Sequence, residues 1–161
     1  YATRETYDQL HALARAARTT EDKRRAYGAM QAVLDPQLAR TTLELTLGNE
    51  LSTTEASRNV AAVAAREHAD LAWAFAKENT EALLKKTTFF GRNNYLPGIA
   101  RASTDAARAD ELLALVREKL PVDALTEAEK GADLIRLNAL VKKRELPAMD
   151  AWIKQRVKLP E

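Results

Sequence analysis

The sequence has no cysteine among its 161 residues, and only five glycines and five prolines. The lack of cysteine excludes disulfide bonds, thiolate zinc sites and cysteine nucleophiles. No apolar run reaches the roughly 18 residues that a membrane-spanning helix needs, and no signal-peptide pattern is present. Because the chain begins with Tyr1 rather than methionine, we expect it to be a piece of a longer protein. Nothing in the composition identifies a compartment.

Charge of neither sign dominates. The sequence has 25 lysines and arginines and 23 acidic residues, which gives a net charge of +2. This charge is far below the basic excess of a nucleic-acid-binding protein. The basic clusters lie close to predicted C-terminal ends of helices, where cations complement the helix dipole; they are Arg15 with Arg18, Lys85 with Lys86, and residues 142–144. We therefore predict neither a nucleic-acid partner nor a membrane partner.

Alanine and leucine dominate the apolar residues, and both favour helix. Apolar residues recur at steps of three and four, and no stretch alternates with period two. The tryptophan helix has two predicted inner faces, one with Ala69, Trp73 and Ala76 and one with Ala72, Phe75 and Asn79. The other predicted inner faces, in chain order, are Tyr7, Leu10, Ala14; Ala26, Met30, Val33; Leu38, Thr42, Leu45; Ala56, Val60, Val63; Leu113, Val116, Leu120; and Leu134, Leu137, Val141. The sequence therefore predicts an all-α protein.

Several short signals predict where helices begin. Asp35 followed by Pro36 is a strong start signal, and Ser52 with Glu55 forms a capping box. Further along, Pro121 is expected to end one helix, and Thr126 with Glu129 is expected to open a long one. Pro147 marks the predicted start of a last helix, which carries Trp152.

About eight to ten short helices joined by short turns result from these signals. Short connections favour antiparallel packing of consecutive helices. A stack of such pairs forms an α-solenoid of HEAT or armadillo type, and a closed bundle is the alternative that composition alone leaves open. A chain of 161 residues is expected to form one domain, 1–161.

Catalytic patterns are missing. The two histidines, His11 and His68, have no histidine partner at the helical spacing of a metal site. No glycine-rich phosphate loop is present, and no serine has a histidine near it in the sequence. We predict no catalytic residue and no metal or other cofactor in this chain.

The segment 87–98 is rich in glycine, asparagine and proline, and is predicted to be irregular. Irregular segments on a rigid scaffold often carry binding residues. We therefore predict substrate contact by Arg92, Asn93 and Tyr95. The alternative is that Phe89 and Tyr95 only anchor the segment on the core.

Residues 72–83 carry the pattern A-W-x-F-x-K-x-N-x-E-x-L. This pattern resembles the C-terminal helical domain of the puromycin-sensitive and ERAP-like zinc aminopeptidases. The order of the surrounding elements is similar too, from Tyr7-Asp8-Gln9-Leu10 near the start to Met149-Asp150-Ala151-Trp152-Ile153 near the end. The resemblance thus extends over most of the chain, although no motif in it is as specific as a metal-binding signature.

The resemblance implies an α-solenoid that carries no active site of its own. Such a domain would enclose the chamber of a zinc aminopeptidase and contact the distal part of a peptide substrate. Its partners would be the catalytic domain of the same polypeptide, which holds the zinc, and peptides. Two other interpretations stay open: a free-standing helical-repeat scaffold that binds a protein, and a small all-helical enzyme with an unrecognised site. The complete reading frame would distinguish them.

Overall fold

The computed structural model describes residues 3–88 and 91–156. Over these ranges the chain forms nine α-helices and no strand, which confirms the all-α prediction. The helices are α1 (Arg4–Ala16), α2 (Thr20–Met30), α3 (Pro36–Glu44), α4 (Thr53–Ala64), α5 (Ala69–Glu78), α6 (Thr80–Lys85), α7 (Arg92–Ala100), α8 (Ala107–Lys119) and α9 (Leu125–Arg156), with a 3-10 turn η2 (Val122–Ala124) before α9.

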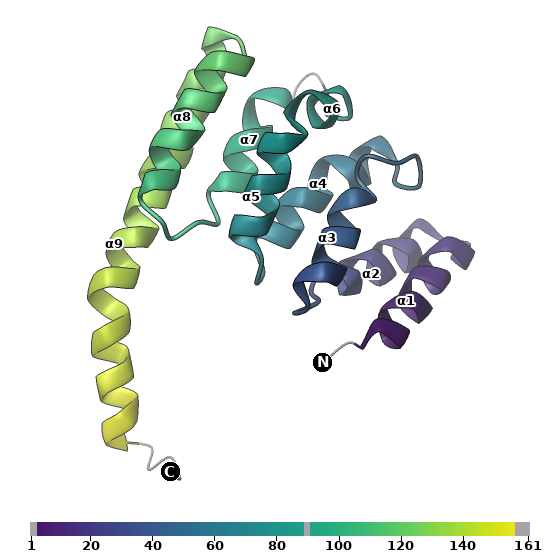
Figure 1. Ribbon diagram of the computed structural model, residues 1–161, viewed down its shortest axis with the longest axis horizontal. Coiled ribbons are helices and arrows are strands. Elements are labelled where there is room, and N and C mark those ends of the chain that lie inside the picture. The colour runs from purple at the N-terminus through teal and green to yellow at the C-terminus, as the bar shows by residue number, and fades with distance from the viewer. Residues whose placement is uncertain (1–2, 89–90, 157–161) are drawn as a thin grey trace.

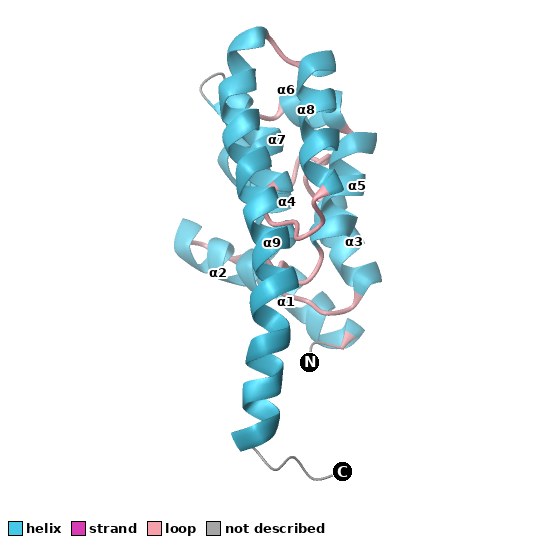
Figure 2. Ribbon diagram, turned by 90° about the vertical axis from the view of Figure 1, so that its left-hand side faces the viewer, coloured by secondary structure: helices cyan, strands magenta, loops and turns pink. Residues whose placement is uncertain are grey.

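The helices follow one another along a curved row. Helices α1 and α2 form one end of the row, and α8 and α9 form the other (Figure 1). Each helix packs mainly against those close to it in the sequence, such as α1 against α2, α4 against α5, and α9 against α7 and α8. The second half of α9 extends beyond the rest of the molecule (Figure 2).

Side-chain caps fix the starts of the first four helices. Asp35 accepts hydrogen bonds from two backbone N–H groups at the start of α3, and Pro36 occupies the first turn. Ser52 and Glu55 form the predicted capping box of α4. Both start signals read from the sequence are therefore confirmed. Each such cap stabilises its helix by about 1 kcal/mol.

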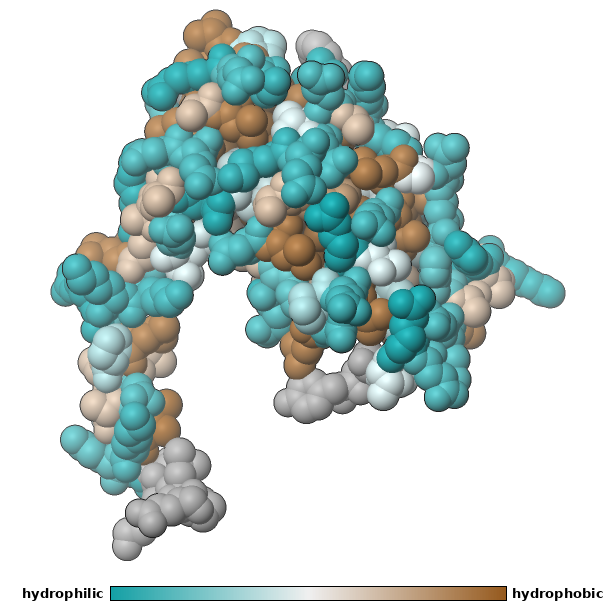
Figure 3. Space-filling model, in the orientation of Figure 1, coloured by the Kyte–Doolittle hydropathy of each residue, from teal (hydrophilic) through white to brown (hydrophobic). Residues whose placement is uncertain are grey.

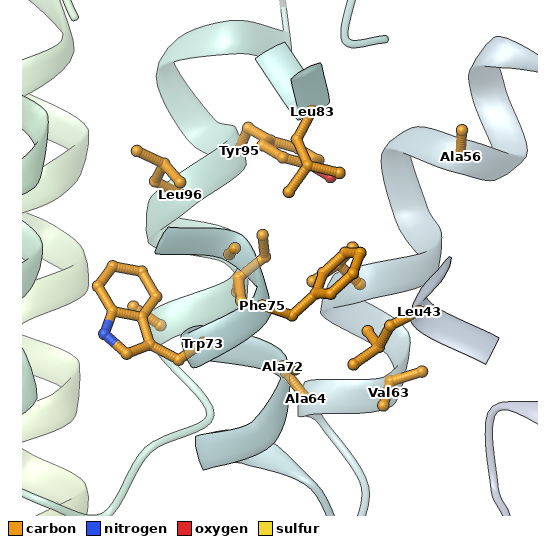
Figure 4. Packing of buried hydrophobic residues seen from close by; sticks show 14 of the residues in the cluster. Leu43, Ala56, Val63, Ala64, Ala72, Trp73, Phe75, Leu83, Tyr95 and Leu96 are labelled. Carbon is orange, nitrogen blue, oxygen red and sulfur yellow. The ribbon is translucent and has the colours of Figure 1, made fainter. Parts of the chain in front are cut away.

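The tryptophan helix α5 lies at the centre of the core. Trp73 and Phe75 are 1% and 0% exposed, and Ala72 and Ala76 are buried with them. Ala69 and Asn79, the outer members of the two predicted faces, are half-buried. Figure 4 shows Phe75 directed toward Leu43 and Val63, whereas Trp73 projects the other way, toward α8. The predicted inner faces of the first four helices are confirmed as well, with Tyr7, Met30, Leu38 and Val60 among the buried residues.

The prediction that residues 87–98 are irregular is wrong in its second half. Helix α7 begins at Arg92 and contains Pro97. Tyr95, Leu96 and Ile99 recur at helical spacing and are buried. Burial of this face outweighs the local preference of asparagine, glycine and proline for turns. Phe89, the other half of the predicted anchor, lies outside the described residues.

Helix α9 corrects the predictions for the end of the chain. It begins at Leu125, so Thr126 lies inside the first turn rather than at a cap. It also continues through Pro147, which was predicted to start a separate helix. The basic residues 142–144 consequently lie in the middle of a helix and not at its C-terminal end. The start of α9 differs from the prediction because Leu125 continues directly from η2 without a break in the chain.

The buried face of α9 also differs from the predicted one. Leu134, Leu137 and Val141 were predicted to face inward, but they are 40–54% exposed. The residues that pack on the domain are smaller: Ala128, Gly131, Ala132 and Ile135. Gly131 allows a close approach, because a Cβ added there would lie 3.1 Å from Leu112 and 3.2 Å from Pro97. The apolar pattern alone did not distinguish the two faces.

Candidate functional site

Two of the three residues predicted to contact a substrate lie at the start of α7. Arg92 is exposed there, and the side-chain amide of Asn93 donates a hydrogen bond of 3.0 Å to Asp123 in η2. This bond fixes the α7 start against the turn that leads into α9. Arg92 and Asn93 therefore lie on a defined helix end instead of a loop.

Tyr95, the third predicted residue, is directed into the protein. It is 6% exposed, and its hydroxyl is buried without a hydrogen-bond partner among the described residues. Burial raises the pKa of Tyr95 above its ordinary value. Figure 4 shows its ring beside Leu83. The structure thus separates Tyr95 from the surface on which Arg92 lies, and its packing holds α7 against α6.

Glu50, in the connection between α3 and α4, is the centre of a polar cluster. Its carboxylate accepts hydrogen bonds from Tyr27 at 2.7 Å and Arg15 at 2.8 Å, and lies 2.5 Å from Nε2 of His11. Burial alone would raise the pKa of Glu50, but the bonds from Arg15, Tyr27 and His11 outweigh it and lower the pKa to about 2. Glu50 thus ties α1 and α2 to the α3–α4 connection.

A groove of about 510 Å³ lies beside this cluster, between α2 and α4. Its walls combine apolar surface from Leu51 and Ala62 with polar groups from Tyr27, Gln31 and Arg58. Among the described residues, no hydrogen bond or ion pair holds the Arg58 guanidinium. A guanidinium in such a groove can bind a carboxylate with two parallel hydrogen bonds. The groove therefore combines apolar surface with one guanidinium that has no partner among the described residues.

Asn59 forms the polar floor of the same groove. It is 2% exposed, and its amide nitrogen donates to the Thr42 carbonyl at 2.7 Å and to the Thr46 hydroxyl at 2.8 Å. Its amide oxygen accepts from Gln31 at 2.9 Å. Because its polar atoms are bonded, Asn59 fixes the spacing of α2, α3 and α4 around the groove.

A second polar junction links α5 to α8. The indole N–H of Trp73 donates to Glu111 at 2.8 Å, and Lys77 and Arg108 also reach this carboxylate. The hydrogen bond from Trp73 is the main cause that lowers the pKa of Glu111. Arg108 lies over the Trp73 ring and pairs with Asp70 at 2.8 Å. This junction positions the end of the row that carries α9.

The side-chain hydrogen bonds between helices and their connections span up to 39 positions in the sequence. Those that join α1 to α3, α3 to α5 and α5 to α8 link residues 34 to 38 positions apart, whereas the bond from Thr42 in α3 to the Met30 carbonyl in α2 spans 12. The bond from Asn138 in α9 to the Arg101 carbonyl spans 37 positions. Among the described residues no side-chain hydrogen bond spans more than 39 positions, the distance from His11 to Glu50.

Neither histidine lies in a metal site. His11 contacts Glu50, and Nε2 of His68 lies 2.9 Å from the Val33 carbonyl oxygen. Within residues 3–88 and 91–156, no three acidic, histidine or cysteine side chains are grouped so that they could hold a metal ion. The same part of the chain contains no helix that is long and apolar enough to cross a membrane.

Residues 1–136 match a family model described as the ERAP1-like C-terminal domain. This match covers most of the chain, so the chain belongs to the family of C-terminal domains of ERAP1-like aminopeptidases. The resemblance read from residues 72–83 is thereby confirmed. No curated protein sequence matches the chain. Residues 137–161, which include the second half of α9, lie beyond the matched part.

Sequence reasoning missed Glu50, Glu111 and Asn59, which organise these junctions. Glu50 follows a glycine and an asparagine in a connecting segment, and Glu111 lies on a helix rich in charges. Neither context differs from that of an ordinary surface carboxylate. Asn59 carried a weak signal, because it lies three positions after Ala56 and four before Val63, and so on the predicted inner face of its helix.

Proposed function

We propose that this chain is the non-catalytic C-terminal domain of a zinc-dependent aminopeptidase. The observation that carries the proposal is the family match over residues 1–136. The described residues offer no set of zinc ligands, so the zinc and the general base would be held by a catalytic domain elsewhere in the same polypeptide. The residues of this chain would act on the substrate by enclosing it and binding its distal part.

The arrangement we propose for the domain 1–161 is an α-solenoid of HEAT type. Its support is the short range of the polar contacts, which span at most 39 positions among the described residues. In stacked-repeat proteins each unit of 20–45 residues contacts only its neighbours, whereas a closed bundle would bring its first and last helices together. Figure 1 agrees with this arrangement, because α1 and α9 lie at opposite ends of the curved row of helices.

The surfaces we assign to peptide contact are the start of α7 and the α2–α4 groove. Arg92 and Arg58 are both exposed, and Asn93 is half-buried beside Arg92. Each guanidinium can pair with a peptide carboxylate, and such a charge-assisted bond is about twice as strong as a neutral one. Tyr95, which we also predicted to contact the peptide, would contribute by holding α7 in place from within the core.

The complete reading frame tests the proposal as a whole. We expect a zinc-binding H-E-x-x-H sequence upstream of this chain in the same polypeptide. A reading frame that lacks any catalytic domain would refute the proposal and leave the free-standing scaffold as the better interpretation.

Contact with the peptide is tested by Arg92→Ala in the full-length enzyme. Because Arg92 would lie far from the bond that is cleaved, kcat/KM should fall about tenfold for a peptide of about ten residues, the loss of roughly 1.4 kcal/mol of binding. It should not change for a single-residue chromogenic substrate. Arg58→Ala tests the groove in the same way. Arg18→Ala, which removes an exposed arginine from the turn after α1, is the matched control. Equal effects on both substrates would show that Arg92 supports the fold only.

A further inference from the structure

The second half of α9, residues 141–156, forms an arm whose described residues are all exposed. At 1.5 Å per residue the arm is about 24 Å long. Its contact with the rest of the described chain is a hydrogen bond of 3.0 Å from Lys142 to Thr104 in the α7–α8 connection. An arm that leaves its own domain in this way offers its surface to something else.

One face of α9 runs without interruption from the domain into the arm. On the domain, this face carries Ile135, which is buried, and Asn138, which bonds to the Arg101 carbonyl. Lys142 follows one turn later. Steps of four, three and four residues then lead along the same face to Leu146, Met149 and Ile153. The face that packs on the domain therefore continues as an apolar face that the described residues leave uncovered.

The exposed apolar area on the arm is large. Leu146, Met149, Trp152 and Ile153 are 49%, 56%, 55% and 41% exposed. Single exposed apolar side chains are common, but a contiguous set on one helix face marks an interaction site. In the space-filling view, apolar residues gather on the side of the arm that is turned into the hollow between it and the rest of the molecule (Figure 3).

The position of this face argues against a membrane. A flat bilayer would meet the outer side of the arm, whereas the apolar side is turned into the hollow (Figure 3). The occupant must be a convex element that enters the hollow, such as a helix or a lobe of a protein. It must present apolar side chains to Met149 and its neighbours.

The charges at the ends of the arm argue against self-pairing. The arm carries five basic residues, at 142–144 near one end and at 154 and 156 near the other, against two acidic ones, Glu145 and Asp150. Lys154 pairs with Asp150, and Arg156 lies over the Trp152 ring at 4.6 Å. Two arms side by side would place basic ends against basic ends in either orientation, which is unfavourable. The matching surface is instead apolar in its middle and carries carboxylates at both ends.

We propose that the arm docks, through Leu146, Met149, Trp152 and Ile153, onto an acidic-rimmed apolar surface of the catalytic domain in the same polypeptide. This inference rests on the proposed function, which supplies a covalently linked partner. A linked partner is present at millimolar effective concentration, so a contact of this modest size is sufficient. The arm would thus latch the C-terminal domain to the part of the enzyme that it encloses.

Photo-crosslinking in the full-length enzyme tests the docking. Replacement of Met149 by p-benzoylphenylalanine places the reactive group on the apolar face. We expect crosslinks within one polypeptide, to a catalytic-domain segment that has acidic residues near it. The same replacement at Val122, which is 81% exposed in η2, is the control and should not reach that segment. Crosslinks to a second copy, or only to lipid when phosphatidylglycerol vesicles are added, would overturn the proposal.

Hydrogen exchange provides a second measurement that does not depend on the crosslinker. Residues 141–156 should be protected in the full-length enzyme, and Trp152→Ser should raise their exchange rate at least about tenfold, whereas Leu13→Ser on the exposed face of α1 should not. An active aminopeptidase with an unprotected arm would refute the docking alone. A reading frame without a catalytic domain would refute the proposed function itself.

Discussion

Trp73 combines the largest buried apolar surface in this core with a polar bond at its edge. It is 1% exposed, and its indole N–H donates to Glu111 at 2.8 Å. Trp73→Ala should lower the free energy of unfolding by about 3–5 kcal/mol. Trp152→Ala is a matched control, because Trp152 is 55% exposed, and in the isolated chain it should change stability by less than about 0.5 kcal/mol. Urea denaturation followed by circular dichroism measures both, and equal effects would remove Trp73 from the core.

Glu50 makes stability depend on pH. Its pKa in the folded protein is about 2, below the ordinary value of 4.5. A carboxyl group whose pKa falls on folding stabilises the fold above its unfolded pKa, and this contribution is lost as the pH falls from 4.5 toward 2. The difference corresponds to at most about 3 kcal/mol.

The variant Glu50→Gln separates this contribution from the other carboxylates. We expect it to lose up to about 3 kcal/mol at pH 7, and to show a flatter decline in stability between pH 4.5 and pH 2 than the parent chain. Denaturation midpoints at a series of pH values give both quantities. If the two proteins show parallel declines, Glu50 does not titrate as its contacts indicate.

At the scale of helices, Gly28 and Gly131 form a natural pair for comparison. Both lie inside helices, where alanine is favoured over glycine by about 1 kcal/mol. A Cβ at Gly28 would meet nothing within 4 Å, whereas one at Gly131 would lie 3.1 Å from Leu112 and 3.2 Å from the Pro97 ring. Gly28→Ala should therefore raise the free energy of unfolding by about 1 kcal/mol. For Gly131→Ala the same gain is offset by overpacking, which costs about 1–3 kcal/mol. Denaturant titrations give the difference, and equal gains would contradict the close approach of α9.

Helix starts that depend on local chemistry could be predicted from the sequence. The Asp35 cap and the Ser52–Glu55 capping box bond within three residues of themselves. Trp73 was also predictable, because a helix apolar on two sides must lie inside. These features require no knowledge of distant parts of the chain.

The features that could not be predicted are those that depend on which surface of the domain a helix packs against. Leu134 and Leu137 have the spacing of a core face, yet the domain accepts only the small residues beside Gly131. The prediction of an irregular segment at residues 87–98 was wrong for a similar reason, because burial of Tyr95 and Leu96 maintains a helix through Pro97. Of the candidate site, Arg92 and Asn93 were chosen from the composition of residues 87–98, and their contact with a peptide stays a prediction. The partners of Glu50 come from two other helices, and a single sequence contains no sign of them.

At the scale of the molecule, the arm should be dispensable for the fold of the isolated chain. A chain that ends at residue 140 loses only exposed residues among those described, and should melt within about 2 °C of the parent. A chain that ends at residue 124 also loses Ala128, Ala132 and Ile135, which are fully buried, and should not fold cooperatively. Scanning calorimetry of the three chains tests this. Loss of folding on removal of the arm alone would show that the arm packs on its own domain.

The short range of the contacts between helices has an evolutionary consequence. Because no side-chain hydrogen bond among the described residues spans more than 39 positions, each bond depends on the chain length between neighbouring helix pairs only. An in-frame duplication or deletion of one whole pair would leave the remaining bonds in register. An insertion of one or two residues inside a helix such as α5 would instead rotate Trp73 away from Glu111. We therefore expect the fold to tolerate the gain or loss of whole helices better than a change in the length of one helix.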